Sequence, residues 1–150
     1  MWRPLANMIR GLNTFRHERK IKRALTLNQR SDMRSDGLKL KNVCNRLEIE
    51  WCARDIHPWD RHDPPETRAS LFVRQCLNDT DAAITRLFET LPQVDVIAVR
   101  VLEPATEEVI VAGTVRRAAP APDTVLSAGM RLRQRGVTYH SDGWRFEPLT

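Results

Sequence analysis

The sequence predicts an α+β domain that follows a separate N-terminal arm. Residues 47–54 alternate between apolar and polar side chains, which is the pattern of a strand with one buried face. The apolar side chains of residues 66–91 recur every three or four positions, as they do on one face of a helix. Two later segments, 94–102 and 109–115, are rich in valine and isoleucine, the composition of buried strands. Strands and helices therefore alternate along one chain.

The first strand and the first helix are the most strongly patterned elements. The two faces of the strand carry, in turn, Leu47, Ile49, Trp51 and Ala53, and Glu48, Glu50, Cys52 and Arg54. A loop from Asp55 to Pro65 leads to the helix, which we expect to run from about Glu66 to Leu91. Asp63 has the side chain of an N-cap, and Pro92 marks the end of the helix because proline cannot continue it.

The second half of the chain predicts a hairpin and then a shorter helix. Residues 94–102 and 109–115 are joined by a short polar connection, so we expect them to pair as a β-hairpin. Asp123 has the character of a second N-cap, and Gly136 follows a basic stretch in the position of a residue that ends a helix. The segment between Asp123 and Gly136 is therefore predicted to be helical.

The chain ends in residues 137–140 and 144–146, which flank a Ser-Asp-Gly turn and predict either one kinked strand or a small hairpin. The order along the chain is then strand, helix, strand, strand, helix, strand. This order is that of the ferredoxin-like (βαββαβ) fold, an antiparallel sheet with both helices on one face. We expect residues 42–150 to form a single α+β domain of this kind.

The charge of the chain is concentrated at its N-terminal end. Residues 1–41 contain 11 Lys or Arg and 3 Asp or Glu, a net charge of +8. Residues 42–150 contain 13 and 16, a net charge of −3, so the overall +5 belongs to the arm. Such a segment favours an anionic partner, whether lipid headgroups, nucleic acid or an acidic protein surface.

Residues 1–27 have the pattern of an amphipathic helix followed by a basic patch. The apolar side chains lie on an arc of about 140° of a helical wheel and are those of Trp2, Leu5, Met8, Ile9, Leu12 and Phe15. The basic side chains that follow are those of Arg16, Arg19, Lys20, Lys22 and Arg23. Residues 28–41 are polar and rich in turn signals, so we interpret them as a linker.

The arm is the part of the chain that predicts a function. Its apolar arc could lie at the acyl boundary of a membrane, with the basic patch on anionic headgroups, or fill a groove on a protein assembly. It could also fold back over its own sheet, or bind nucleic acid without sequence preference. We expect a non-catalytic accessory or adaptor subunit, with Trp2, Leu5, Ile9, Leu12 and Phe15 as apolar contacts and Arg16, Arg19, Lys20, Lys22 and Arg23 as charged ones.

One loop predicts an alternative, catalytic function. His57, Asp60, His62 and Asp63 lie within seven residues, and imidazole with carboxylate is a ligand set for zinc. This set would make the chain a metal-dependent hydrolase. The other interpretation is that Asp63 caps the helix and the histidines are solvated. We found no nucleophile motif or phosphate-binding loop, and the sequence predicts no cofactor.

Two further patterns limit the partner and the compartment. Glu48 and Glu50 share one face of the first strand, where two carboxylates would repel phosphate, so RNA binding would have to use the arm. The three cysteines are an odd number without a C-x-x-C pair, which is typical of reduced thiols in the cytoplasm. No apolar segment approaches the length of about 20 residues that spans a bilayer, so a cytoplasmic protein, free or peripheral at a membrane, is expected.

Overall fold

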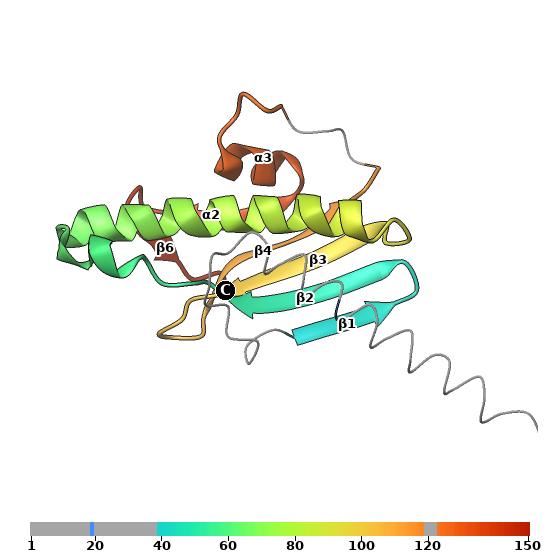
Figure 1. Cartoon of the computed structure of the whole chain (residues 1–150), viewed down its shortest axis with the longest axis horizontal. Coiled ribbons are helices and arrows are strands. Elements are labelled where there is room, and N and C mark those ends of the chain that lie inside the picture. Colours follow the sequence, from blue (N-terminus) through green and yellow to red (C-terminus); the bar gives the residue numbers. More distant parts are fainter. Residues whose placement is uncertain (1–18, 20–38, 119–122) are drawn as a thin grey trace, which may run out of the picture.

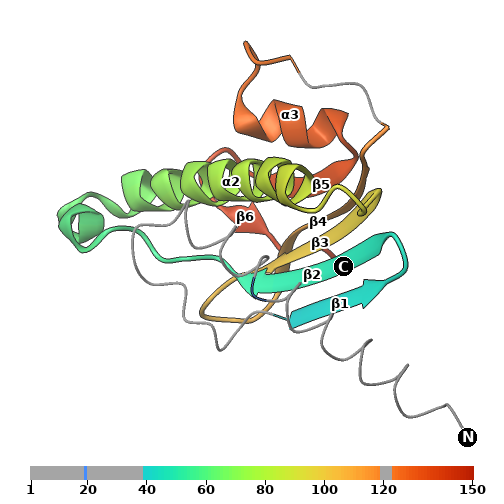
Figure 2. The same ribbon diagram turned by 45° about the vertical axis from the view of Figure 1, so that its right-hand side comes forward.

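A computed structural model describes Arg19, residues 39–118 and residues 123–150. In these ranges the chain is mixed α and β, with a six-stranded sheet and two α-helices (Figures 1 and 2). The spatial order of the strands, β1 to β6, is also their order along the chain. Each strand therefore pairs with its neighbours in sequence.

The centre of the fold is a β-α-β unit. Strand β2 (Arg46–Cys52) leads through helix α2 (Pro65–Thr90) to strand β3 (Val96–Leu102), and β2 and β3 pair in parallel. A parallel pair needs such a crossover because the chain must return to the end of the sheet at which the first strand began. The alternating side chains that face α2 are almost fully buried, and are those of Leu47, Ile49, Trp51, Ile97, Val99 and Val101.

The predicted helix is confirmed, but its N-cap is not Asp63. Helix α2 begins at Pro65, a favoured first helical residue because proline has no N–H to leave unpaired. Pro64 occupies the N-cap position and makes no side-chain capping hydrogen bond. Asp63 instead ends a short 3₁₀ helix, η2 (Pro58–His62), where its own N–H donates to the Asp60 carbonyl. The two consecutive prolines displace the helix start beyond the reach of the Asp63 side chain.

Strand β1 (Lys39–Val43) begins in residues 28–41, the segment predicted to be a polar linker, and ends two residues beyond it. It pairs antiparallel with β2 through a tight turn at Cys44 and Asn45, and Cys44 has a positive φ of 55°. The pairing places Lys39 opposite Glu50 and Lys41 opposite Glu48. The sequence pattern did not predict this strand, because lysines stand at alternate positions. An edge strand such as β1 can carry charge on its outer face.

The second half of the sheet is antiparallel. Strand β4 (Val109–Arg116) forms the expected hairpin with β3 and then pairs with β5 (Val137–Ser141). Strand β6 (Phe146–Glu147) pairs with β5, so the terminal segment is a small hairpin. Helix α3 (Ala128–Gln134) lies between β4 and β5.

Helix α3 is shorter than the sequence indicated. Its N-cap is Ser127, whose hydroxyl accepts from the Met130 N–H, and not Asp123. The Asp123 carboxylate accepts from the Val125 N–H and so forms a turn ahead of the helix. Gly136 follows the helix with a φ of +92°, in agreement with its predicted role at the helix end.

The ferredoxin-like prediction is wrong about the sheet. In that fold the two strands joined by the first helix are separated by a third strand, whereas β2 and β3 are immediate neighbours here. The second helix also joins an antiparallel pair, β4 and β5, and the sheet gains an edge strand at each end. The elements were predicted in the correct order, but their order in the sheet depends on long-range pairing that the local pattern does not contain.

Both helices form one layer. Helix α2 runs along the sheet, and α3 packs against α2 and against β5 (Figures 1 and 2). An ionic cluster joins the helices, in which the Asp81 carboxylate accepts from Arg131 at 2.8 Å and lies 3.7 Å from Arg135. The Arg135 guanidinium also donates to the Thr85 hydroxyl. No described helix covers the other face of the sheet, which we call the open face.

Candidate functional site

Most of the predicted arm lies outside the part of the chain that the structure describes. This holds for Trp2, Leu5, Ile9, Leu12, Phe15, Arg16, Lys20, Lys22 and Arg23. Arg19 is the one predicted contact residue within the described ranges, and it is exposed. The chain that follows the arm enters the domain at Lys39, the first residue of the edge strand β1.

The four candidate metal ligands lie on or beside η2. The His57 ring accepts a hydrogen bond from the Trp59 N–H and stacks on the Trp59 ring, which is 82% exposed. Asp60 and His62 lie in the turn of η2 itself, and Asp63 ends it. Among the described residues, no three His, Cys, Asp or Glu side chains are grouped so that they could hold a metal ion. The loop therefore places His57 against Trp59 and does not bring the four candidate ligands together.

The carboxylates of the open face are paired with cations. Glu50 lies between Lys39 and Arg100, at 3.2 Å and 3.1 Å, and Glu48 lies 3.3 Å from Arg46. These side chains surround a depression of about 390 Å³ over β1, β2 and β3. The sequence suggested a face that repels phosphate, but the missed strand β1 supplies two lysines that offset this charge.

The described strands have few exposed aromatic rings. In the described strands the Trp, Tyr and Phe residues are Trp51, Tyr139 and Phe146, and all three belong to or pack against the core beneath the helices, whereas the His140 ring in β5 is exposed. RNA-binding sheets need exposed rings on which bases can stack. That this face is a poor platform for RNA stays a prediction.

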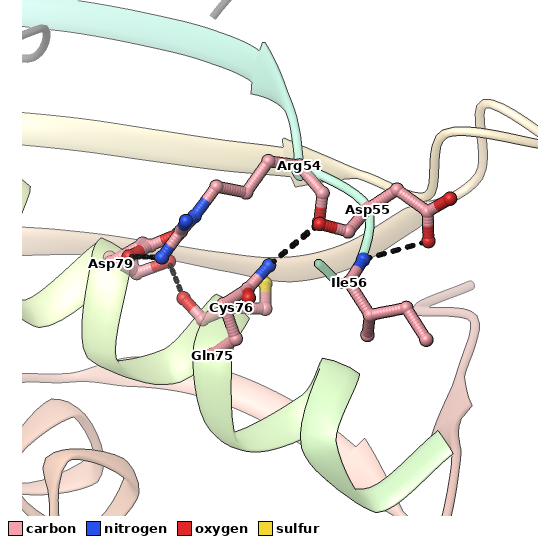
Figure 3. Close-up of polar contacts among 7 residues, drawn as sticks. Arg54, Asp55, Ile56, Gln75, Cys76 and Asp79 are labelled. Atoms are coloured by element: carbon pink, nitrogen blue, oxygen red, sulfur yellow. Dashed lines mark hydrogen bonds and ion pairs between the residues drawn. The ribbon is translucent and has the colours of Figure 1, made fainter. Parts of the chain in front are cut away.

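A polar clasp fixes the end of β2 to helix α2. The Arg54 guanidinium makes two hydrogen bonds to Asp79, at 2.6 Å and 3.1 Å, and the Gln75 amide donates to the carbonyls of Arg54 and Asp55 (Figure 3). The Asp55 carboxylate accepts from the Ile56 N–H at 2.8 Å. The clasp determines where the chain turns away from β2, and so positions the loop that follows.

Cys76 lies beneath this clasp and is predicted to be chemically inert. Burial, reinforced by the charge of Asp79, raises the pKa of its thiol to about 12 from the ordinary 9.0. We expect a disulfide reagent at pH 8 to modify the exposed Cys44 rapidly and to leave Cys76 unmodified until denaturant is added, because the thiolate is the reactive form. A thiol count in native and unfolded protein measures this, and rapid reaction of all three thiols in native protein would contradict it.

The same pKa makes stability depend on pH. The folded chain holds the Cys76 proton more tightly than the unfolded chain does, so this stabilisation is complete below about pH 9 and is lost as the pH rises towards 12. A Cys76→Ala variant should therefore lose less stability than the natural chain between these values, as measured by urea denaturation at each pH.

A cleft lies at the carboxyl ends of the parallel strands. Strands β2 and β3 point to the same end of the sheet as the N-terminal half of α2, the β3–β4 connection and β6 (Figure 1). The cleft has a volume of about 450 Å³, and we call it the β2–β3 cleft. Its apolar lining consists of Ile56, Ala69, Phe72, Pro104, Ala105, Ile110, Phe146 and Pro148.

Charged groups enter the β2–β3 cleft from several segments. Arg68 lies in the second turn of α2, and its Nε is buried with no hydrogen-bond partner among the described residues. The Glu103 carboxylate is held by the N–H groups of Ala105 and Thr106, at 2.9 Å and 2.7 Å. Asp55, Glu108 and Arg145 complete the charged lining.

Arg145 belongs to the turn before β6. The N–H groups of Arg145 and Trp144 both donate to the Asp142 carboxylate, and these bonds hold the pKa of Asp142 below its ordinary 3.8. This turn sets the path of the chain into β6 and so places Arg145 and Phe146 at the cleft.

Sequence reasoning did not find the β2–β3 cleft. Its residues are far apart in the sequence and match no motif, and Arg68 reads as one of several arginines on a long helix. The available signal was the β-α-β order, because ligands of such units bind beyond the carboxyl ends of the parallel strands. That signal needs β2 and β3 to be neighbours, and the ferredoxin-like prediction separated them.

Searches with this chain among protein-family models, curated proteins and solved structures gave no match.

Proposed function

We propose that this protein is a non-catalytic accessory or adaptor subunit, which docks through residues 1–27 onto a larger protein assembly or an anionic membrane surface. The observation that carries the proposal is the division of charge, +8 over residues 1–41 and −3 over residues 42–150. A cytoplasmic location, free or peripheral at a membrane, belongs to this proposal. In the described ranges, no helix combines the length and the apolar character needed to cross a bilayer.

The arm combines two kinds of contact. Apolar side chains from Trp2 to Phe15 supply anchors that fill a groove or reach the acyl boundary. The basic side chains from Arg16 to Arg23 add about 1 kcal/mol each at an anionic membrane surface, and they speed the encounter with an acidic protein surface. Neither kind alone gives firm attachment, so we expect both to be needed.

The domain gives the arm a rigid base. Its described core of buried side chains begins at Leu47, and Leu40 of β1 and Phe146 of β6 pack against it, so both helices and all six strands contribute. The chain between the arm and this core enters at Lys39 in β1, at the opposite edge of the sheet from β6. Removal of residues 1–27 therefore takes away no described core residue.

Deletion of residues 1–27 should abolish association and leave the domain folded. Two probes separate the two partners: vesicles of phosphatidylcholine with and without phosphatidylserine, and the size of the native complex in extracts of cells that express either chain. Full-length protein should sediment with the anionic vesicles or elute in a large complex, and the truncated chain should do neither. The truncated chain should have the melting temperature of the full-length chain and the circular dichroism spectrum of a folded α+β protein.

A matched charge change controls for general electrostatics. Arg16→Glu with Arg19→Glu should weaken binding as the deletion does, whereas Arg74→Glu with Arg116→Glu, two exposed positions of the domain, should not. The proposal fails if the truncated chain still associates, or if both pairs act equally. Co-purified nucleic acid that salt removes from the full chain alone would make the arm a nucleic-acid contact instead.

A further inference from the structure

We propose that the β2–β3 cleft binds a small monocarboxylic acid with an apolar body, whose carboxylate pairs with Arg68. The inference is independent of the proposed docking function, since it concerns a different part of the molecule. Four observations lead to it: the position of the cleft in the fold, its size and lining, the state of Arg68 and the balance of the remaining charges.

The position is the one in which the β-α-β topology creates binding sites. The chain leaves β2 towards α2 and leaves β3 towards β4 at the same end of the sheet, and the two connections diverge (Figure 1). Loops that diverge beyond the carboxyl ends of parallel strands leave a crevice between them. Here Ile56 lines the crevice from one connection and Pro104 from the other.

The size and lining suit a small apolar molecule. The volume of about 450 Å³ lies within the range of roughly 300–1,000 Å³ that is usual for small-molecule sites. The rings of Phe72 and Phe146 meet edge to face, with 6.0 Å between their centroids. Both rings line the cleft, as does Ile110. These side chains offer an apolar body a surface that excludes water.

Arg68 supplies the polar anchor. The Nε–H of Arg68 is a buried donor without an acceptor among the described residues, which costs free energy that a carboxylate would recover once the Arg68 side chain turns into the cleft it lines. Arg68 takes part in no ion pair among the described residues, whereas Arg54 pairs with Asp79. A carboxylate matches the fork of a guanidinium and can accept two parallel hydrogen bonds from it.

The other charges disfavour a ligand with more than one negative charge. Asp55 and Glu103 accept hydrogen bonds from backbone N–H groups, Asp55 also lies 3.8 Å from Arg61, and neither forms an ion pair with Arg68. With Glu108 and Arg145 included, the lining carries a net charge of −1, which opposes a doubly charged phosphate. The positive end of α2 lies beside the cleft and favours one negative charge there.

The test compares an acid with its neutral analogue on the full-length protein. The probes are 4-phenylbutyrate, 4-phenylbutanamide and inorganic phosphate, and binding is measured by titration calorimetry and by chemical shifts. We expect the acid to bind about tenfold more tightly than the amide, since a charged hydrogen bond contributes more than a neutral one, and phosphate to bind weakly.

Variants then assign the preference to Arg68. Arg68→Met should reduce acid binding to the level of the amide, and Arg68→Lys should retain part of the preference. Arg74→Met, an exposed arginine of the same helix that does not line the cleft, should leave it unchanged. Ala69→Phe fills the cleft without touching a charge and should abolish binding of both organic probes. Arg68→Met should not lower the melting temperature of the ligand-free protein, because it removes an unpaired buried donor.

Several results would overturn the inference. Equal binding of acid and amide would remove the role of the carboxylate, and an acid preference that survives Arg68→Met would place it elsewhere. Phosphate that binds as tightly as the acid would make the ligand class wrong. Absence of binding by either organic probe, with the chain folded, would remove the site.

Discussion

Replacement of Asp81 with alanine is expected to lower the free energy of unfolding by about 3 kcal/mol, because the partly buried positive charges that remain would have no anionic partner. Asp81 is 8% exposed; its carboxylate accepts hydrogen bonds from Arg131 and forms an ion pair with Arg135 at 3.7 Å, and these contacts join α3 to α2. The Arg135 side chain is only 14% exposed, so its guanidinium cannot return to water without moving the helix. Urea denaturation followed by circular dichroism measures the loss.

Two further variants show where that free energy comes from. Asp79→Ala breaks a neighbouring pair, but the side chain of its partner Arg54 is 37% exposed and can be rehydrated, so we expect a loss of about 1 kcal/mol. The triple change Asp81→Leu, Arg131→Met and Arg135→Met should recover most of the stability, because it removes the buried charges together. A loss below that of Asp79→Ala on changing Asp81 alone would contradict this account of the helix layer.

Replacement of Gly113 with alanine is the second change with a large expected effect. Gly113 lies in β4, where an added Cβ would meet the Val137 Cα at 2.6 Å and the Gly136 carbonyl oxygen at 2.7 Å. Both atoms are backbone, so the clash is relieved only if β4 and β5 move apart. We expect a loss of about 3 kcal/mol, at the upper end of what overpacking costs, measured by thermal or urea unfolding.

Gly143 provides the matched control for Gly113. An alanine Cβ at Gly143 would have no neighbour within 4 Å, but the φ of +96° disfavours any side chain. Gly143→Ala should therefore cost about 1 kcal/mol through backbone strain alone. If the two substitutions cost the same, the close approach of β4 and β5 is not what requires glycine at Gly113.

The sequence predicted those elements whose pattern is set by one buried face. The stripe of α2 and the alternation of β2 survive in the structure with boundaries moved by one or two residues. The edge strand β1 was not predicted, because Lys39 and Lys41 are charged side chains at its alternate positions. Its pairing with β2 also depends on a turn in which Cys44 has a left-handed backbone conformation. Local pattern identifies an element through its burial, and edge strands have little.

The sites divide in the same way. The contact residues of the arm could be proposed from the sequence because an amphipathic helix is a local pattern, and they remain a prediction. The β2–β3 cleft could not, because Arg68, Glu103 and Arg145 become neighbours only when β2 and β3 pair. The His57 loop shows the converse: closeness in sequence suggested a metal site, whereas the 3₁₀ turn uses His57 to accept from its own backbone.

The agreement between sheet order and chain order bears on how this protein reaches its native state. Every strand meets a partner that is either the next segment synthesised or one helix away, so no pairing waits for a distant end of the chain. Short loop closures reduce the entropic barrier, and chains rich in such contacts fold faster than sheets built from remote strands. We therefore expect the local hairpins β1–β2, β3–β4 and β5–β6 to form before α2 brings together β2 and β3, whose paired residues are 50 positions apart.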